Sequence, residues 1–131
     1  MSRVKIGSKK WYKDECDKLF SLIVRSRGCE ETNIKNPGKL NCCHIMPRGY
    51  LATRWDLENA ICLTWGRHRW YTSRPLEWEE FVVSKVGLSK YDDLKRRARA
   101  GIKRSLEDYQ ELYDKLVAKA QAKHLGFISH K

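Results

Sequence analysis

The feature that most limits the fold of this chain is a pair of short apolar segments of strand length, residues 40–45 and 60–63. Short apolar runs bounded by turn-forming residues are typical of β-strands. The connection between them, residues 48–58, has no clear period, and a short helix is expected to begin at Trp65 or Gly66. This order is strand, loop, strand, helix, and with the helical patterns on both sides it predicts a mostly helical α+β fold.

Helical patterns flank these strands on both sides. Over residues 8–27 apolar side chains recur every three or four positions, and Gly28 stands where a C-terminal helix cap belongs. Downstream, Pro75 is well placed in a first helical turn, because its missing N–H group has no partner to lose there. The helix that follows Pro75 is expected to end before Gly87.

Two pairs of residues, Ser89 with Asp92 and Ser105 with Asp108, have the spacing of capping boxes at helix N-termini. The second pair opens the longest expected helix, at about residues 106–124. Its apolar stripe favours packing in the core over a dimer seam. The stripe consists of Leu106, Tyr109, Leu112, Tyr113, Leu116 and Ala120.

Length and composition predict one globular domain. With 131 residues, of which 41% are hydrophobic, the chain is long enough for one core and too short for two. No run of eighteen apolar residues occurs, so no transmembrane span is expected. The basic N-terminus lacks the apolar region of a secretory signal, so we expect a cytoplasmic protein.

The charge balance is strongly basic, with 27 Lys and Arg against 16 Asp and Glu and a formal net charge of +11. A basic domain suits a polyanion, because each neutralised phosphate releases condensed counterions. Nucleic acid is therefore the favoured partner. A merely soluble basic protein is the alternative, and an anionic membrane surface is less favoured still.

The five cysteines do not predict a disulfide framework. Their number is odd, and Cys42 and Cys43 are adjacent in the chain. No C-x-x-C pair occurs, so the sequence offers no standard structural zinc knuckle.

The chemistry of the chain is expected to centre on His44, Asn59 and His68. His44 stands at the end of the first expected strand, Asn59 follows it by fifteen residues, and His68 follows Asn59 by nine. A lone His beside apolar residues is more often packed than reactive. Two His and one Asn in this order and local structure are harder to explain by packing alone.

Three segments of the chain resemble the HNH, or ββα-metal (His-Me finger), endonuclease family. They are C-C-H-I-M-P-R at 42–48, L-E-N-A-I-C-L at 57–63 and R-H at 67–68. The resemblance is to its small phage-encoded members, and it covers about residues 26–83. It implies a single HNH nuclease domain over residues 1–131, with a ββα-metal core at about 38–73 and a helical part at about 75–125. That core would consist of a short two-stranded antiparallel hairpin and a helix. It also implies metal-dependent nicking or cutting of double-stranded DNA with little sequence specificity, in the host cytoplasm if the protein is phage-encoded.

The same resemblance implies a role for each residue of the motif. His44 would be the general base, because an imidazole accepts a proton from water near neutral pH. His68 would ligate one divalent cation, with Mg²⁺ or Mn²⁺ favoured and Zn²⁺ an alternative. Asn59 would fix the loop that carries His44 through hydrogen bonds to its backbone.

The chain departs from the family pattern at two places. Many members have Asp directly before the base, where this chain has Cys43. Either Cys43 ligates a softer metal or it is a small buried apolar residue, and the second reading is favoured. Asp56 or a water would then fill the missing ligand position. Of the cysteines that would align with a structural zinc site only Cys29 is retained, so no structural zinc is predicted.

Arginines around the motif are expected to contact DNA, because guanidinium groups suit phosphate oxygens. A second basic cluster at residues 95–104 either extends this surface or is a solvated helix face. The arginines near the motif are Arg48, Arg54, Arg67, Arg69 and Arg74.

Two other functions compete with the nuclease. One is a catalytically weakened DNA-binding protein on an HNH fold, and the other is an interaction module built on the helix at 106–124. A monomer is favoured. Phage packaging or recombination proteins are partners that only the family resemblance implies.

Overall fold

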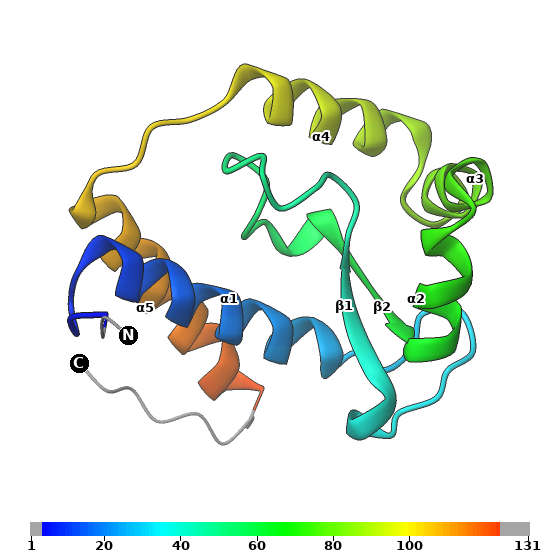
Figure 1. Cartoon of the computed structure of the whole chain (residues 1–131), viewed down its shortest axis with the longest axis horizontal. Helices are drawn as coiled ribbons and strands as arrows, with labels where there is room; N and C mark the ends of the chain where they lie inside the picture. The colour runs from blue at the N-terminus through cyan, green and yellow to red at the C-terminus, as the bar shows by residue number, and fades with distance from the viewer. Residues whose placement is uncertain (1–3, 124–131) are drawn as a thin grey trace.

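The computed structural model describes residues 4–123 of the chain and shows five α-helices and one two-stranded sheet in that part (Figure 1). Two short 3₁₀ helices, Pro37–Lys39 and Leu57–Asn59, each lead into a strand. The helices and strands are α1 (Lys9–Arg25), β1 (Leu40–His44), β2 (Ala60–Thr64), α2 (Trp65–Thr72), α3 (Pro75–Val86), α4 (Leu88–Ala100) and α5 (Leu106–Ala122). The predicted fold class, a mostly helical α+β fold with an antiparallel hairpin, is confirmed.

The hairpin lies between two helices. β1 and β2 pair antiparallel, with Cys42 opposite Cys62 and His44 opposite Ala60. α1 and α2 both contact the two strands, and the first four residues of β2 are all buried. A strand covered on both faces reads as a continuous apolar run, which is why the sequence A-I-C-L shows no alternation.

α1 begins at a side-chain cap and packs by a continuous apolar face. Ser8 accepts a hydrogen bond from the backbone N–H of Trp11. After the helix, Gly28 has a φ of 76°, and an added Cβ would lie 2.9 Å from the Lys35 side chain. The buried face of α1 consists of Trp11, Tyr12, Cys16, Leu19, Phe20, Ile23 and Val24.

α5 packs along α1 and uses the apolar stripe predicted for it. Tyr113 is fully buried, and its ring lies 5.6 Å from that of Trp11 and 5.5 Å from that of Tyr12. The capping box at the start of α5 is confirmed, since Ser105 N–H donates to Asp108 and Asp108 N–H donates to Ser105 Oγ. Most of the stripe is therefore core, as predicted, but Leu106 at the start of α5 is 40% exposed.

The other predicted capping box, at Ser89, is wrong. α4 begins at Leu88, directly after Gly87, so Ser89 lies inside the first turn. Gly87 has a φ of 90°, which lets the chain turn from α3 into α4 at one residue. Pro75, by contrast, is the first residue of α3, as predicted. Within residues 4–123, no helix is long and apolar enough to cross a membrane.

Candidate active site

A pocket of about 380 Å³ lies between β1, α2 and α3, and it brings together the two histidines of the motif. His44 is the last residue of β1, and His68 lies in α2. Asn59 does not line this pocket and is fully buried. The lining residues are Cys42, Cys43, His44, Arg48, His68, Tyr71, Thr72, Pro75 and Trp78.

The His44 ring is held on two sides. Its plane stacks on Phe20 of α1, with 5.1 Å between the ring centroids and 23° between the planes. Its Nε2 lies 2.8 Å from the backbone carbonyl oxygen of Arg54. Since a carbonyl oxygen can only accept, Nε2 carries the hydrogen and the neutral ring keeps its lone pair on Nδ1. Burial lowers the pKa of His44 below 6.5, so the ring is neutral, and basic at Nδ1, at neutral pH.

Asn59 ties together the two ends of the loop that follows His44, which we call the 45–59 loop. Its side-chain oxygen accepts a hydrogen bond of 2.7 Å from Met46 N–H. Its amide nitrogen donates to the carbonyl oxygens of Met46 and Thr53, at 3.1 and 3.0 Å. The backbone of Asn59 also accepts from Ile45 N–H at 2.8 Å. Asn59 thus makes the backbone contacts predicted for it.

Asp17 of α1 anchors the same loop from outside, and the sequence analysis did not identify it. Its carboxylate accepts hydrogen bonds from the side chains of Arg48, Arg54 and Trp55. Burial alone would raise the pKa of Asp17, but the hydrogen bonds and charge of Arg54 hold it below its ordinary value. The only sign of this role in the local sequence is that Asp17 is an acidic residue beside the buried face of a helix, three positions before Phe20.

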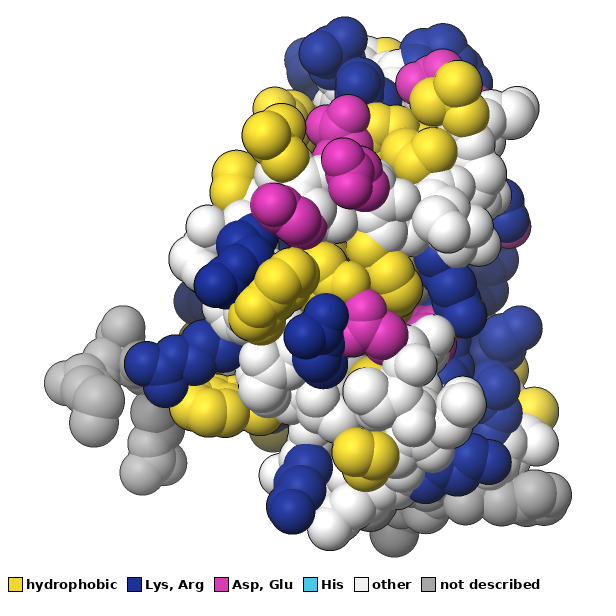
Figure 2. Space-filling view, turned by 90° about the vertical axis from the view of Figure 1, so that its right-hand side faces the viewer, with side chains coloured by type: hydrophobic (Ala, Val, Ile, Leu, Met, Phe, Trp, Pro, Cys, Tyr) yellow, Lys and Arg dark blue, Asp and Glu magenta, His cyan; other side chains and the backbone are white. Residues whose placement is uncertain are grey.

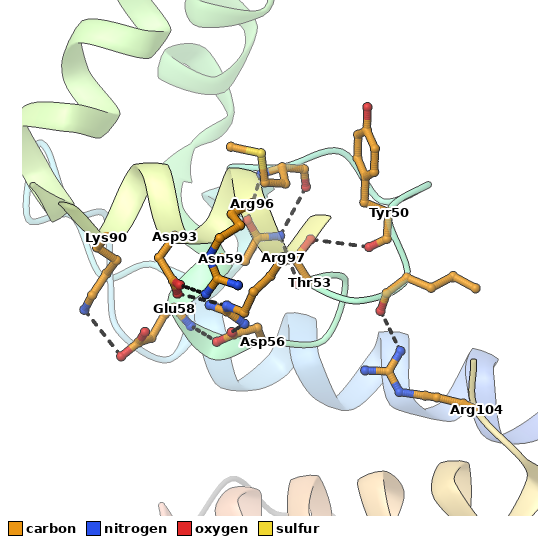
Figure 3. Close-up of polar contacts among 12 residues, drawn as sticks. Tyr50, Thr53, Asp56, Glu58, Asn59, Lys90, Asp93, Arg96, Arg97 and Arg104 are labelled. Carbon is orange, nitrogen blue, oxygen red and sulfur yellow. Dashed lines mark hydrogen bonds and ion pairs between the residues drawn. The ribbon is translucent and has the colours of Figure 1, made fainter. Parts of the chain in front are cut away.

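α4 and the segment after it hold the outer side of the 45–59 loop (Figure 3). Arg97 of α4 donates to Asp56 at 2.6 Å, and Lys90 pairs with Glu58 at 3.3 Å. Arg104 donates to the carbonyl oxygen of Leu51 at 2.6 Å. Part of the basic cluster predicted as a DNA-contacting or solvated surface therefore neutralises and binds this loop.

The predicted metal ligands do not form one cluster. Cys43 lines the pocket from β1 but is buried, and burial raises the pKa of its thiol to about 12, so the metal-binding thiolate is disfavoured. Asp56 does not line the pocket; it caps the turn at Glu58 and pairs with Arg97. In the part of the chain that the structure describes, no three His, Cys, Asp or Glu side chains are arranged to hold a metal ion.

His68 is exposed on α2 and is the only one of the three predicted metal ligands that faces the pocket from a helix. α2 begins at Thr64, whose side chain accepts a hydrogen bond from Arg67 N–H at 3.3 Å. Glu31, which the sequence analysis also missed, binds the side chains of Arg67 and Tyr71 and so attaches α2 to the segment before β1. Nothing local in the sequence marks Glu31, because both partners lie more than thirty residues away.

The five arginines predicted to contact DNA divide into two groups. Arg48 and Arg54 pair with Asp17, and Arg67 pairs with Glu31. Arg48 nevertheless remains 59% exposed and lines the pocket, whereas the Arg54 side chain is only 20% exposed. The other two, Arg69 and Arg74, lie over the rings of Trp65 and Trp70.

Figure 2 shows the side of the molecule that carries α2 and α3, where hydrophobic side chains lie beside basic and acidic ones. No His side chain is visible in this view. Comparisons of the chain with protein-family models, with curated proteins and with solved structures find no match in any of the three.

Proposed function

We propose that this chain is an endonuclease of the HNH type that hydrolyses phosphodiester bonds in DNA, with His44 as the general base. The observation that carries the proposal is the bond between His44 Nε2 and the Arg54 carbonyl oxygen, in a ring that lines a pocket shared with His68. This bond leaves Nδ1 as the basic atom. A neutral, oriented imidazole in a pocket is the arrangement that general-base catalysis needs.

In the proposed reaction, His44 Nδ1 accepts a proton from a water molecule as that water attacks the phosphorus atom. The P–O bond opposite the attacking water breaks, the leaving oxygen takes up a proton from solvent water, and His44 then releases its proton to solvent. Arg48, which lines the pocket and is mostly exposed, binds a phosphate oxygen. Phe20, Asn59 and the Arg54 carbonyl keep the ring in place and do not themselves touch the substrate.

We also propose that His68, which lines the pocket, binds a divalent cation through its imidazole. The described residues supply no set of three ligands for it. The roles proposed for His44, Asn59 and Arg48 do not depend on that cation. The net charge of +11 supports DNA as the substrate, because binding a polyanion releases its counterions.

The proposal is tested by relaxation of supercoiled plasmid with the wild type, His44→Ala, His68→Ala and the surface control Lys10→Ala. Lys10 is exposed on α1, in a pair with Asp14, and is remote from the pocket lining. We expect His44→Ala to lower the cleavage rate by at least about a hundredfold, in line with the loss of a general base. Cleavage by His44→Ala at the rate of Lys10→Ala would reject the assignment of the base.

A second candidate function is DNA binding without cleavage. The lack of a three-ligand cluster among the described residues and the neutral Cys43 thiol favour it. It predicts DNA affinity that falls steeply with salt, and no plasmid relaxation with Mg²⁺, Mn²⁺ or Zn²⁺. Addition of EDTA separates the candidates, because relaxation that stops with EDTA and returns with excess Mg²⁺ or Mn²⁺ supports the nuclease.

A further inference from the structure

We propose that the pocket between β1, α2 and α3 binds an unpaired nucleobase, so that the preferred substrate is DNA with an unpaired nucleotide beside the scissile phosphate. This inference rests on the proposed function, because it takes that phosphate to lie at His44 and His68. It adds a substrate class to a site whose polar residues alone would accept any phosphodiester.

The lining of the pocket has a polar part and an apolar part. His44 and Arg48 come from the hairpin side, whereas Pro75 and Trp78 come from α3. Hydrolysis of a phosphodiester uses proton acceptors, cations and hydrogen-bond donors. It has no use for an indole and a proline ring, so the apolar part indicates contact with another portion of the substrate.

Trp78 has the properties of a stacking platform. It is half-buried, and it lines the pocket while its ring packs 5.4 Å from Tyr71 and 6.2 Å from Phe81. Tyr71 is held in turn by its hydroxyl bond to Glu31. A rigid aromatic ring beside a basic surface is how proteins bind unpaired bases, since each base has a π-face whatever its identity.

The size and the charge of the pocket agree with this occupant. A volume of about 380 Å³ is in the range of small-molecule sites, and such sites accommodate a base with its sugar. Arg48, at the polar end, is exposed enough to reach the attached phosphate. A base stacked in a duplex cannot enter a side pocket without leaving the stack, which costs least where the base is already unpaired.

The test measures binding by fluorescence anisotropy in EDTA, so that no strand is cut. Three probes share one sequence: a perfect duplex, the duplex with one bulged thymidine, and the duplex with an abasic residue at the bulge. Stacking of one base on an aromatic ring is worth about fivefold to 150-fold in affinity. We expect the wild type to bind the thymidine bulge at least about fivefold tighter than either other probe.

Three variants assign that preference to the pocket. Trp78→Leu keeps an apolar side chain but removes the stacking face, and Thr72→Phe fills the pocket from an exposed position on α2. Both are expected to bind the three probes equally. Trp65→Leu is the matched control, because Trp65 is 58% exposed on α2 and does not line the pocket. It should keep the wild-type preference.

Two results would overturn the inference: equal binding of the three probes by the wild type, or an undiminished thymidine preference in both Trp78→Leu and Thr72→Phe. Binding is measured in EDTA and cutting is measured on plasmid, so the two proposals are tested by separate readouts. Equal binding of the three probes by a wild type that cuts plasmid would reject only the base pocket, and plasmid cutting by His44→Ala at the rate of Lys10→Ala would reject only the assignment of the catalytic base.

Discussion

Asp17 of α1 and Arg54 of the 45–59 loop form a two-point ion pair, in which Arg54 Nε and Nη2 donate to the two carboxylate oxygens at 3.1 and 2.6 Å. The backbone carbonyl of the same Arg54 accepts the hydrogen bond from His44 Nε2. The position of the imidazole therefore depends on a carboxylate that lies 37 residues from Arg54 in the chain. The same helix supplies Phe20, on which the imidazole stacks.

Asp17→Asn is expected to lower activity and stability together. The amide keeps the shape of the side chain but loses the charge that binds Arg48 and Arg54. Hydrogen bonds to charged groups contribute about 1.5–3 kcal/mol, so we expect a loss of about 2 kcal/mol in the free energy of unfolding. A small shift of the Arg54 carbonyl misplaces the base, for which we expect about a tenfold to hundredfold fall in kcat. Denaturant unfolding and plasmid cleavage measure the two effects.

Asp14→Asn is the control for this change. Asp14 lies on the same helix and pairs with Lys10 at the surface, where both side chains are largely exposed. Such a pair is worth less than about 0.5 kcal/mol, and no link leads from it to His44. Equal effects of the two substitutions would show that Asp17 has no special part in positioning His44.

The pH dependence of cleavage is expected to follow the lowered pKa of His44. Burial, the largest cause, disfavours the charged ring, so His44 stays neutral to a lower pH than a free imidazole. A general base must be unprotonated, so kcat/KM should be level at neutral pH and fall only as the pH drops through a midpoint below 6.5. The charge of Asp17 raises this pKa, so Asp17→Asn should move the acid limb to still lower pH. A midpoint above 6.5 would contradict the assignment.

Asn59→Ala is expected to destabilise the whole fold. The substitution leaves Met46 N–H and the carbonyl oxygens of Met46 and Thr53 without the partners that Asn59 provides. These groups are buried, and each buried polar group left unpaired costs about 1–3 kcal/mol, so we expect a total of about 3 kcal/mol. Asn36→Ala, which removes only an exposed bond to Gly38 N–H, should cost less than about 1 kcal/mol. Denaturant unfolding of both variants measures these losses, and equal losses would contradict the role given to Asn59.

Local sequence signals were sufficient for most of the fold. The spacing of apolar residues predicted α1 and α5, and short apolar runs between turn residues predicted β1 and β2. The start of α4 was misplaced because a capping pair can be recognised from spacing, whereas the backbone angle of Gly87 that begins the helix earlier cannot. The sequence pattern shows that Ser89 could cap a helix, but it does not show that the backbone at Gly87 begins the helix earlier.

The motif residues of the site could be predicted from the sequence, whereas the carboxylates that hold the surrounding segments in place could not. His44 and His68 line one pocket, and Asn59 bonds to the loop backbone, as the motif predicted. Asp17 and Glu31 escaped notice because their partners are distant in the chain and follow no period. The same carboxylates pair with Arg54 and Arg67, which are far less exposed than Arg48, so charge density alone overstated the number of arginines free to bind phosphate.

The two predicted capping boxes provide a matched pair of substitutions. Ser105→Ala removes a hydroxyl that accepts a bond from Asp108 N–H at 3.1 Å, and loss of such a cap costs about 1 kcal/mol. Ser89→Ala lies inside the first turn of α4, where Ala is the better helix former, and should change stability by less than about 0.5 kcal/mol. Denaturant unfolding of the two variants compares them directly, and an equal loss would contradict the start of α4 at Leu88. α5 packs on α1, which carries Asp17 and Phe20, so Ser105→Ala also tests whether a loss of stability at the start of α5 changes the cleavage rate. We expect Ser105→Ala to cleave at the wild-type rate below its melting temperature, since the cap contacts neither Asp17 nor Phe20.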